Sequence, residues 1–299
     1  MIADRFPSTR IPITQFRILV QQFESSMRFA SGTTRHVYRK ALDQLVAFAR
    51  SNPFKFTPSD IAQFRLWLLN KKKLTNNSVN TYLTASRRFC EFLVELGVLQ
   101  KNPAWSVHGR AQDFRMTDID LPQVERAIAT IERATILGKR DFAFLTAMME
   151  SGATISELLN ADIGDLKRSG KSGEMRVKSR GKRSKTEILR LSEQAHRAIL
   201  DYISSRGPVA ADEPLFAKVH VGRSLRTRLT SRGVRAAMRK RLRFSGRKSL
   251  PLDSVRTFCG LKLLKQGKTA EEVRVLMRFK SMMPLRRILL NSQSKATAK

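Results

Sequence analysis

The sequence is short of acidic residues, with 25 Asp and Glu against 57 Lys and Arg and a formal net charge of +32. No acidic residue occurs between Glu213 and Asp253, although that stretch carries twelve Lys and Arg. Such an excess of one sign destabilises a compact chain unless a polyanion compensates it. Nucleic acid is the usual polyanion, and its binding weakens steeply as salt rises. The composition therefore favours double-stranded DNA as the partner, with an anionic membrane surface as a weaker alternative.

Long apolar runs and targeting segments are also missing. No stretch approaches the ~20 apolar residues that a membrane-spanning helix needs, and the start of the chain does not have the layout of a signal peptide. The two cysteines, Cys90 and Cys259, each lie in an apolar helical pattern and are expected to be core thiols in a reducing compartment. The sequence thus predicts a cytoplasmic protein with no membrane partner.

Metal ligands and exposed aromatics are scarce as well. The four histidines are scattered, with no Cys or carboxylate at ligand spacing, so we expect no metal and no cofactor. Aromatic residues make up 7% of the chain and fall mostly at apolar helix positions. RNA-binding proteins commonly stack bases on exposed aromatics, so an RNA-binding scaffold is disfavoured.

The first hundred residues carry helical signals at short intervals. Apolar residues at helical spacing predict four helices, near 14–29, from 33, from 59 and over 75–96. Ser59 or Asp60 is the expected N-cap of the third helix. Gly97 and then Asn102-Pro103 end the series, which predicts a helical domain over 1–108 and a linker over 109–117.

The second half mixes helices with one predicted hairpin. An apolar helix and a Gly turn precede a short helix in which Ser156 is the expected cap, and residues 174–191 alternate as a β-hairpin with a basic turn. A basic helix is predicted over 230–242 and further helices over 250–290. We expect a second domain over 118–290 and a flexible tail over 291–299. The fold class is mainly α with a small β-hairpin or sheet (α+β).

Several motifs in this order resemble the tyrosine recombinase, or phage integrase, family. They are Thr-Pro-Ser-Asp-Ile from Thr57, Asn-Ser-Val-Asn-Thr-Tyr from Asn77, Ile-Ser-Glu-Leu-Leu from Ile155, and the Arg-bearing helix start at Arg256. The resemblance covers about residues 14–290. It implies a helical core-binding (SAM-like) domain lying across one face of a DNA duplex, followed by an integrase-type catalytic-fold domain.

The resemblance also implies where the reaction chemistry would lie. The family uses two Arg on the scissile phosphate, a Lys general acid, His or Trp partners, the second of which follows a Gly, and a Tyr nucleophile. In this chain these positions hold Thr154, Lys182, Asp253, Arg256, Phe279 and Ile288, and the only tyrosines are Tyr38, Tyr82 and Tyr202. Loss of one preorganised donor costs about 10²–10³ in rate. On that basis we expect no catalytic residues and a chain that is not an enzyme.

Candidate DNA contacts are short polar and cationic residues at helix starts and on basic faces, the types that position a protein on phosphates without reading sequence. In the first domain they are Thr33, Thr34, Arg35, Asn76, Asn77, Asn80, Arg87 and Arg88. In the second they are Arg180, Lys182, Arg183 and Lys185 of the hairpin turn, Arg232, Arg235 and Arg239 of the basic helix, and Arg256.

Three functions remain open from these residues. The first is a sequence-specific DNA-binding regulator or repressor of a mobile element or prophage, associated with the nucleoid. The second is a non-cleaving accessory subunit that joins an active recombinase, and the third is an active recombinase with displaced residues. Either a homo-oligomer or an active recombinase partner is compatible with the apolar residues of the last forty positions, such as Val273, Leu276 and Met283.

Overall fold

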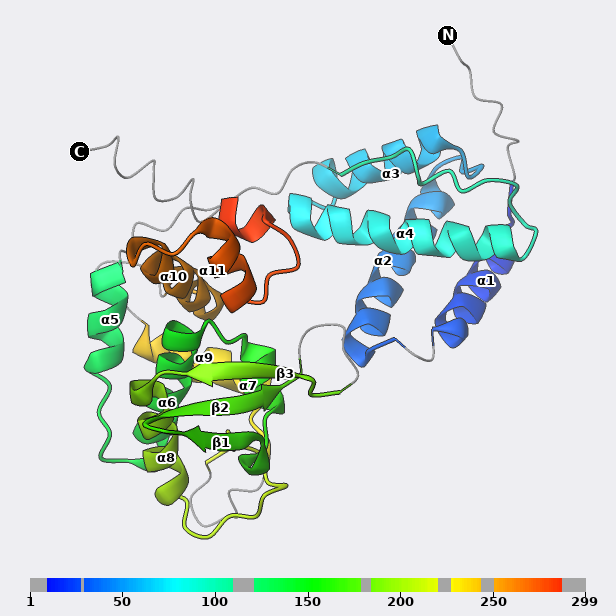
Figure 1. The fold of residues 1–299 in the computed structure, drawn as a ribbon. Coiled ribbons are helices and arrows are strands. Elements are labelled where there is room, and N and C mark those ends of the chain that lie inside the picture. Colours follow the sequence, from blue (N-terminus) through cyan, green and yellow to red (C-terminus); the bar gives the residue numbers. More distant parts are fainter. Residues whose placement is uncertain are drawn as a thin grey trace. The chain divides into compact units, whose positions relative to one another are not determined.

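The computed structural model describes residues 10–27, 30–109, 121–178, 184–219, 227–242 and 250–286. The chain divides into two compact units, Met1–Arg115 and Met116–Lys299 (Figure 1). The predicted fold class is confirmed, because the described residues are mainly helical with one small sheet. Residues 110–117 of the predicted linker, the tail, and the candidate residues Arg180, Lys182, Arg183 and Ile288 lie outside the described residues. The finer division at 108, 117 and 290 therefore stays a prediction.

The first unit is a helical bundle of α1 (Ile13–Ser26), α2 (Gly32–Ser51), α3 (Pro58–Asn70) and α4 (Asn76–Glu95). Its core consists of large apolar side chains, among which Phe16, Phe64 and Phe89 are fully buried. The predicted cap of α3 was wrong by two or three positions. Thr57 is the N-cap and forms a capping box with Asp60, because Pro58 already occupies the first helical turn.

The second unit places two long helices against a three-stranded sheet. The sheet has the order β1-β2-β3, all antiparallel, with β1 Leu166–Ser169, β2 Ser172–Val177 and β3 Glu187–Leu191. The hairpin of β2 and β3 was predicted, whereas β1 was not. That strand has only one intermediate and three exposed positions, so it lacks the apolar alternation that reveals a strand. Helices α6 (Ile136–Ser151) and α8 (Glu193–Ser204) pack on each other and on the sheet (Figure 1).

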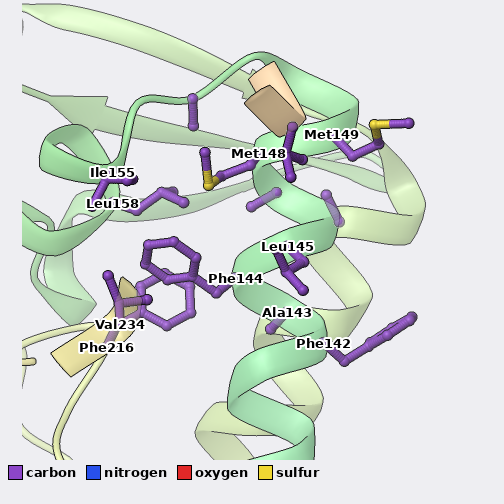
Figure 2. Close-up of a cluster of buried hydrophobic side chains, with 14 of the residues drawn as sticks. Phe142, Ala143, Phe144, Leu145, Met148, Met149, Ile155, Leu158, Phe216 and Val234 are labelled. Carbon is purple, nitrogen blue, oxygen red and sulfur yellow. The ribbon is translucent and has the colours of Figure 1, made fainter. Parts of the chain in front are cut away.

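The core of this unit forms around α6, which is buried along most of its length. Phe144 meets Phe216 edge to face with ring centroids 4.9 Å apart, and Met148, Ile155 and Val234 belong to the same buried cluster (Figure 2). Gly152 ends α6 in the left-handed conformation, with φ 61°, as a helix C-cap requires. This turn brings the short helix α7 (Ile155–Asn160) back beside the core.

The remaining helices of the second unit are α5 (Leu121–Ala129), α9 (Ser231–Arg241), α10 (Leu252–Lys265) and α11 (Ala270–Leu276), and a 3-10 turn η1 (Ile163–Asp165) precedes β1. The basic helix α9 agrees with the predicted span within one residue at each end, because Thr230 caps it and Leu242 follows it. A small apolar cluster of Cys259, Val273, Met277 and Leu285 joins α10 to α11. The turns around α7, α10 and α11 form the site described below.

Within the ranges that the structure describes, no helix combines the length and the apolar character needed to cross a bilayer.

Candidate nucleic-acid interface and phosphate site

Thr154, which stands at the first Arg position of the family pattern, is the N-cap of α7. Its hydroxyl accepts a hydrogen bond from the backbone N–H of Glu157 at 3.1 Å, and the Glu157 carboxylate accepts one from the Thr154 N–H at 2.7 Å. This reciprocal pair is a capping box. The prediction that Ser156 caps this helix was wrong, because the helix starts two residues earlier than expected. Thr154 therefore stabilises the start of α7.

Arg256, on the first turns of α10, is half-buried and points toward the turn after α6. Its Nε donates to the Gly152 carbonyl at 2.7 Å, and its Nη2 donates to the Met277 carbonyl. The ring of Phe279 covers the guanidinium, with Cζ 4.5 Å from the ring centroid. Burial lowers the pKa of Arg256 to about 10, the Glu157 charge opposes this, and the Arg278 charge adds to it. Arg256 thus joins two loops, and its Nη1 has no acceptor among the described residues.

Arg278, which directly precedes Phe279, places a second guanidinium beside Arg256. Its Nε and Nη2 donate to the two Glu157 oxygens at 3.1 and 2.9 Å, and Nη2 also donates to the Gly152 carbonyl at 3.2 Å. Both arginines therefore donate to the same carbonyl oxygen. The ion pair is buried, with side chains 13% and 4% exposed. Burial raises the pKa of Glu157, but the hydrogen bond and charge of Arg278 outweigh it, and the net pKa is lowered.

The backbone at Arg278 is strained. Its φ is 53°, in the left-handed region that costs a residue with a side chain about 1–3 kcal/mol. The family pattern has a Gly at this point, immediately before the His or Trp, so the backbone conformation fits the pattern while the side chain does not. Reasoning from the sequence missed Arg278. The available signal was an arginine at a position where the motif needs a glycine.

Asp253, at the family's His position, is paired with a cation from another helix. Both of its oxygens accept from Arg235 of α9, the second at 3.1 Å. This bond raises the pKa of Arg235, and both side chains remain about half exposed, at 45% and 63%. The charge of Arg235 is therefore compensated within the protein, which weakens it as a phosphate contact.

The other two arginines predicted on α9 are presented to solvent. Arg232 and Arg239 are exposed, lie on one face with Arg235 at helical spacing, and have no acidic partner among the described residues. Lys240 is exposed next to them. This part of α9 therefore presents three exposed cations without an acidic partner among the described residues.

Lys185, predicted in the hairpin turn, points inward at the base of the hairpin. Its Nζ donates to Asp162 and Asp165, and Asp162 also accepts from Arg228. Burial raises the pKa of Asp162, but these two cations reverse that effect and lower it. Lys185 therefore holds the hairpin to the turn before β1, and as a DNA contact it is already engaged.

In the first unit, neighbouring arginines on α4 have different environments. Arg87 donates to the carbonyls of Ala104 at 3.0 Å and Val107 at 2.7 Å, so it secures the segment that leaves the bundle. Arg88 is 63% exposed and pairs with Glu91 at 2.8 Å. Asn80 lies against Gly109, whose added Cβ would be 1.6 Å from the Asn80 oxygen, so Asn80 is covered by the same segment.

The other predicted residues of this unit lie at two helix starts. Thr34 takes part in the cap of α2, sharing a 2.9 Å hydrogen bond with the Ser31 hydroxyl, whereas Thr33 and Arg35 are exposed. Asn77 is exposed and Asn76 half-buried on the first turn of α4, after its N-cap Thr75. Thr33, Arg35, Asn77 and Arg88 thus remain on the surface, while Arg87 and Asn80 do not.

The tyrosine of the second unit, Tyr202, belongs to the core of that unit. Tyr202 is fully buried in α8, stacks on Phe216 with ring centroids 5.8 Å apart, and its hydroxyl accepts from the Ala217 N–H at 3.2 Å. Burial is the main reason that its pKa is raised. Tyr38 and Tyr82 belong to the helical bundle. The hydroxyl of Tyr202 is therefore not a nucleophile in this arrangement.

Comparison with known proteins identifies the family to which the chain belongs. The model of the phage integrase family matches residues 118–289, and the model of the phage integrase N-terminal SAM-like domain matches residues 19–96. The chain therefore belongs to the phage integrase family, the tyrosine recombinases.

Its particular relatives are proteins named tyrosine recombinase XerC. The chain is 32% identical over 145 residues to that of Pelobacter propionicus, covering 48% of this chain and 47% of the relative. It is 31% identical over 205 residues to that of Salmonella typhi, covering 67% of each. The chain spans about half to two thirds of the length of the first curated relatives it matches.

Solved structures agree on the fold. XerH site-specific recombinase bound to the palindromic difH substrate is 14% identical, covers 93% of this chain and 81% of that chain, and gives a TM-score of 0.68. A lambda integrase dimer bound to a COC' core site is 13% identical, covers 89% of this chain and 95% of that chain, and gives a TM-score of 0.63.

The prediction that the chain is not an enzyme was wrong by this comparison. Its relatives are named recombinases, and recombinases are enzymes. The prediction relied on the residues at six motif positions, two of which lie outside the described residues. It gave no weight to groups such as Arg278 that reach the site from elsewhere in the sequence.

Proposed function

We propose that this chain acts in site-specific recombination, as a protomer that binds duplex DNA with both units. The observation that carries the proposal is the family match over residues 118–289, together with relatives named tyrosine recombinase XerC. The net charge of +32 supports DNA as the partner, since it needs a polyanion. A recombination protomer works on the chromosome, so the proposal places it with the nucleoid.

Exposed arginines are expected to bind the DNA phosphates. Arg232 and Arg239 on α9 and Arg35 on the first unit are exposed and have no acidic partner among the described residues, and Arg88 is exposed but paired with Glu91. Each phosphate contact adds about 0.9 to the slope of log affinity against log salt. Changing Arg232 and Arg239 to Gln should lower that slope by about two. Lys265→Gln, at the exposed end of α10, is the control variant.

The test starts from a duplex selected by the chain from random DNA. Binding is measured by fluorescence anisotropy over a range of salt, and recombination by joining of two duplexes that carry the selected site. A nicked duplex then tests for a covalent DNA–protein adduct. Recombined product supports the proposal. Failure to bind any duplex at physiological salt would contradict it.

A second candidate is a mixed recombinase assembly in which a neighbouring subunit supplies the tyrosine. The observation that favours it is that the chain carries no tyrosine after Tyr202, whose hydroxyl is buried. This candidate expects an adduct on the neighbouring subunit only, with the presence of this chain raising its rate. Labelling each subunit differently and resolving the adduct by mass distinguishes the two.

The hypothesis of a regulator for a mobile element or prophage stays a prediction. It shares DNA binding with the proposal and differs in where the binding sites lie. Sites at promoters would favour a regulator, and sites at recombination loci would favour the proposal.

A further inference from the structure

We propose that Arg278 and Arg256 together form an anion site for one DNA phosphate, with Arg278 as the second guanidinium of the pair. The inference rests on the proposed function, because it takes duplex DNA as the ligand. It assigns a binding residue that the sequence pattern does not contain.

The charges around the pair are unbalanced. Arg256 and Arg278 lie next to one carboxylate, Glu157, and both donate to the Gly152 carbonyl oxygen. Two cations held this close repel each other, and one carboxylate compensates only one of them. Among the described residues, no second acid contacts either guanidinium. A half-buried excess positive charge of this kind is stabilised by an anion.

The pair also retains donors. A guanidinium has five N–H groups, and Arg256 uses two of them on protein carbonyls within the described residues. Arg278 donates four of its N–H groups within the described residues, from Nε and Nη2 to Glu157, from Nη2 to the Gly152 carbonyl and from Nη1 to the Leu276 carbonyl at 3.1 Å, which leaves one. The ring of Phe279 covers one face of Arg256 and restrains its rotation. Phosphate is the anion whose geometry fits several such N–H donors at once.

The backbone gives an independent reason to assign a role to Arg278. The residue adopts φ 53°, which glycine adopts without strain. Strain of this kind is retained where the side chain contributes something in return, and it concentrates at functional sites. In contrast, Thr154 uses its short side chain to cap α7 and cannot reach outward. The guanidinium that approaches Glu157 therefore comes from position 278.

The alternative role for Arg278 is that of a counter-ion for Glu157 and nothing more. The double variant Glu157→Gln, Arg278→Gln separates the two roles, because it removes the ion pair without stranding a charge and leaves an amide oxygen for the cap. A second double variant, Thr154→Arg with Arg278→Gly, supplies the guanidinium from the other side and relieves the backbone strain. Lys265→Gln is the control for loss of one charge far from the pair.

The readout is the salt dependence of binding to a fixed duplex of 30 base pairs, whose length exceeds a single contact site. We expect Arg278→Gln and Glu157→Gln/Arg278→Gln to lower the log–log salt slope by about one, and Thr154→Arg/Arg278→Gly to restore it. Lys265→Gln should change the salt slope by much less than the decrease expected for the Arg278 variants. An unchanged slope in the Glu157→Gln/Arg278→Gln variant would overturn the inference while wild-type binding still supports the proposed function. Absence of wild-type binding would instead overturn the function.

Discussion

The two units bury different kinds of side chain. Among the described residues of the first unit, the buried polar residue is Ser86, and the core is a network of phenylalanines around Phe16, Phe54 and Phe89. The second unit buries charged side chains as well, among them Arg140, Asp141 and Glu157. The first unit therefore depends on apolar burial and the second on ion pairs in addition.

This contrast follows from what each unit has to position. A bundle of amphipathic helices needs only complementary apolar faces. The second unit instead fastens turns whose backbone is not regular, and carbonyls such as that of Gly152 need donors that reach them from distant segments. Buried pairs fix such turns at the cost of sensitivity to pH and to loss of one partner.

The largest expected effect is the loss of Glu157. Glu157→Ala strands Arg278 and removes the capping box, and we expect the second unit to lose about 3–5 kcal/mol of unfolding free energy. Both tryptophans, Trp67 and Trp105, lie in the first unit. Urea unfolding followed by tryptophan fluorescence should therefore stay unchanged while the far-UV circular dichroism transition moves. Coincident shifts of both probes would show that the units do not unfold independently.

Phe16→Ala should have the converse effect. Phe16 is 1% exposed and touches Phe54, Phe56 and Phe89, so its removal opens a cavity and should cost the first unit about 3–5 kcal/mol. Here the fluorescence transition moves to lower urea. Leu66→Ala on the exposed face of α3 is the control, since Leu66 is 44% exposed.

Acid should weaken the second unit first. The pKa of Glu157 is lowered below its ordinary value of 4.5 and that of Asp162 below 3.8. Their ion pairs therefore contribute stability that is present above these values and is lost as pH falls through the lower folded-state pKa. The effect is smaller than deletion, because a protonated carboxyl still forms hydrogen bonds. Glu157→Gln should flatten the pH dependence below about pH 4.5, whereas an unaltered profile would assign that dependence to other carboxylates.

Arg87→Gln tests whether the first unit contains any comparable polar anchor. Arg87 bonds the carbonyls of Ala104 and Val107, so its loss should cost about 1.5–3 kcal/mol. Trp105 is adjacent to the released segment and should report a local change in fluorescence. An unchanged transition would mean that the apolar core alone holds this unit.

Arg88→Gln is the smallest expected change. The Arg88–Glu91 pair is exposed, and such pairs contribute about 0.3–0.5 kcal/mol at most. The same variant should lower the salt slope of DNA binding if Arg88 contacts phosphate, whereas Arg87→Gln should leave that slope unchanged. Equal slopes for both variants would remove Arg88 from the interface.

Much of the fold could be predicted from the sequence, because apolar periodicity and caps are local signals. The four helices of the first unit, the basic helix α9 and the hairpin of β2 and β3 all carry such signals. Strand β1 has little apolar pattern, and its pairing with β2 is decided by the turn at Gly170, where φ is 61°. The cap of α7 was misplaced by two residues because Thr154 and Ser156 have the same chemistry.

The candidate site was harder to predict, because motif positions do not show which way a side chain points. Three of the predicted DNA contacts have a suitable cationic side chain but donate to a carboxylate or carbonyl of the protein instead. They are Lys185, Arg87 and Arg235. Arg278 was missed because its partner is distant in the sequence. It lies 121 positions from Glu157 in sequence, and only the turn after α11 brings the two together.

The capping box at Thr154 and the strained arginine at position 278 constrain how this chain can change over time. Arginine at 154 alone would remove the cap and add a third guanidinium beside two others, and glycine at 278 alone would strand Glu157. Either single step passes through a less stable protein. Related sequences should therefore carry Arg with Gly, or Thr with Arg, at these two positions, and mixed combinations should be rare.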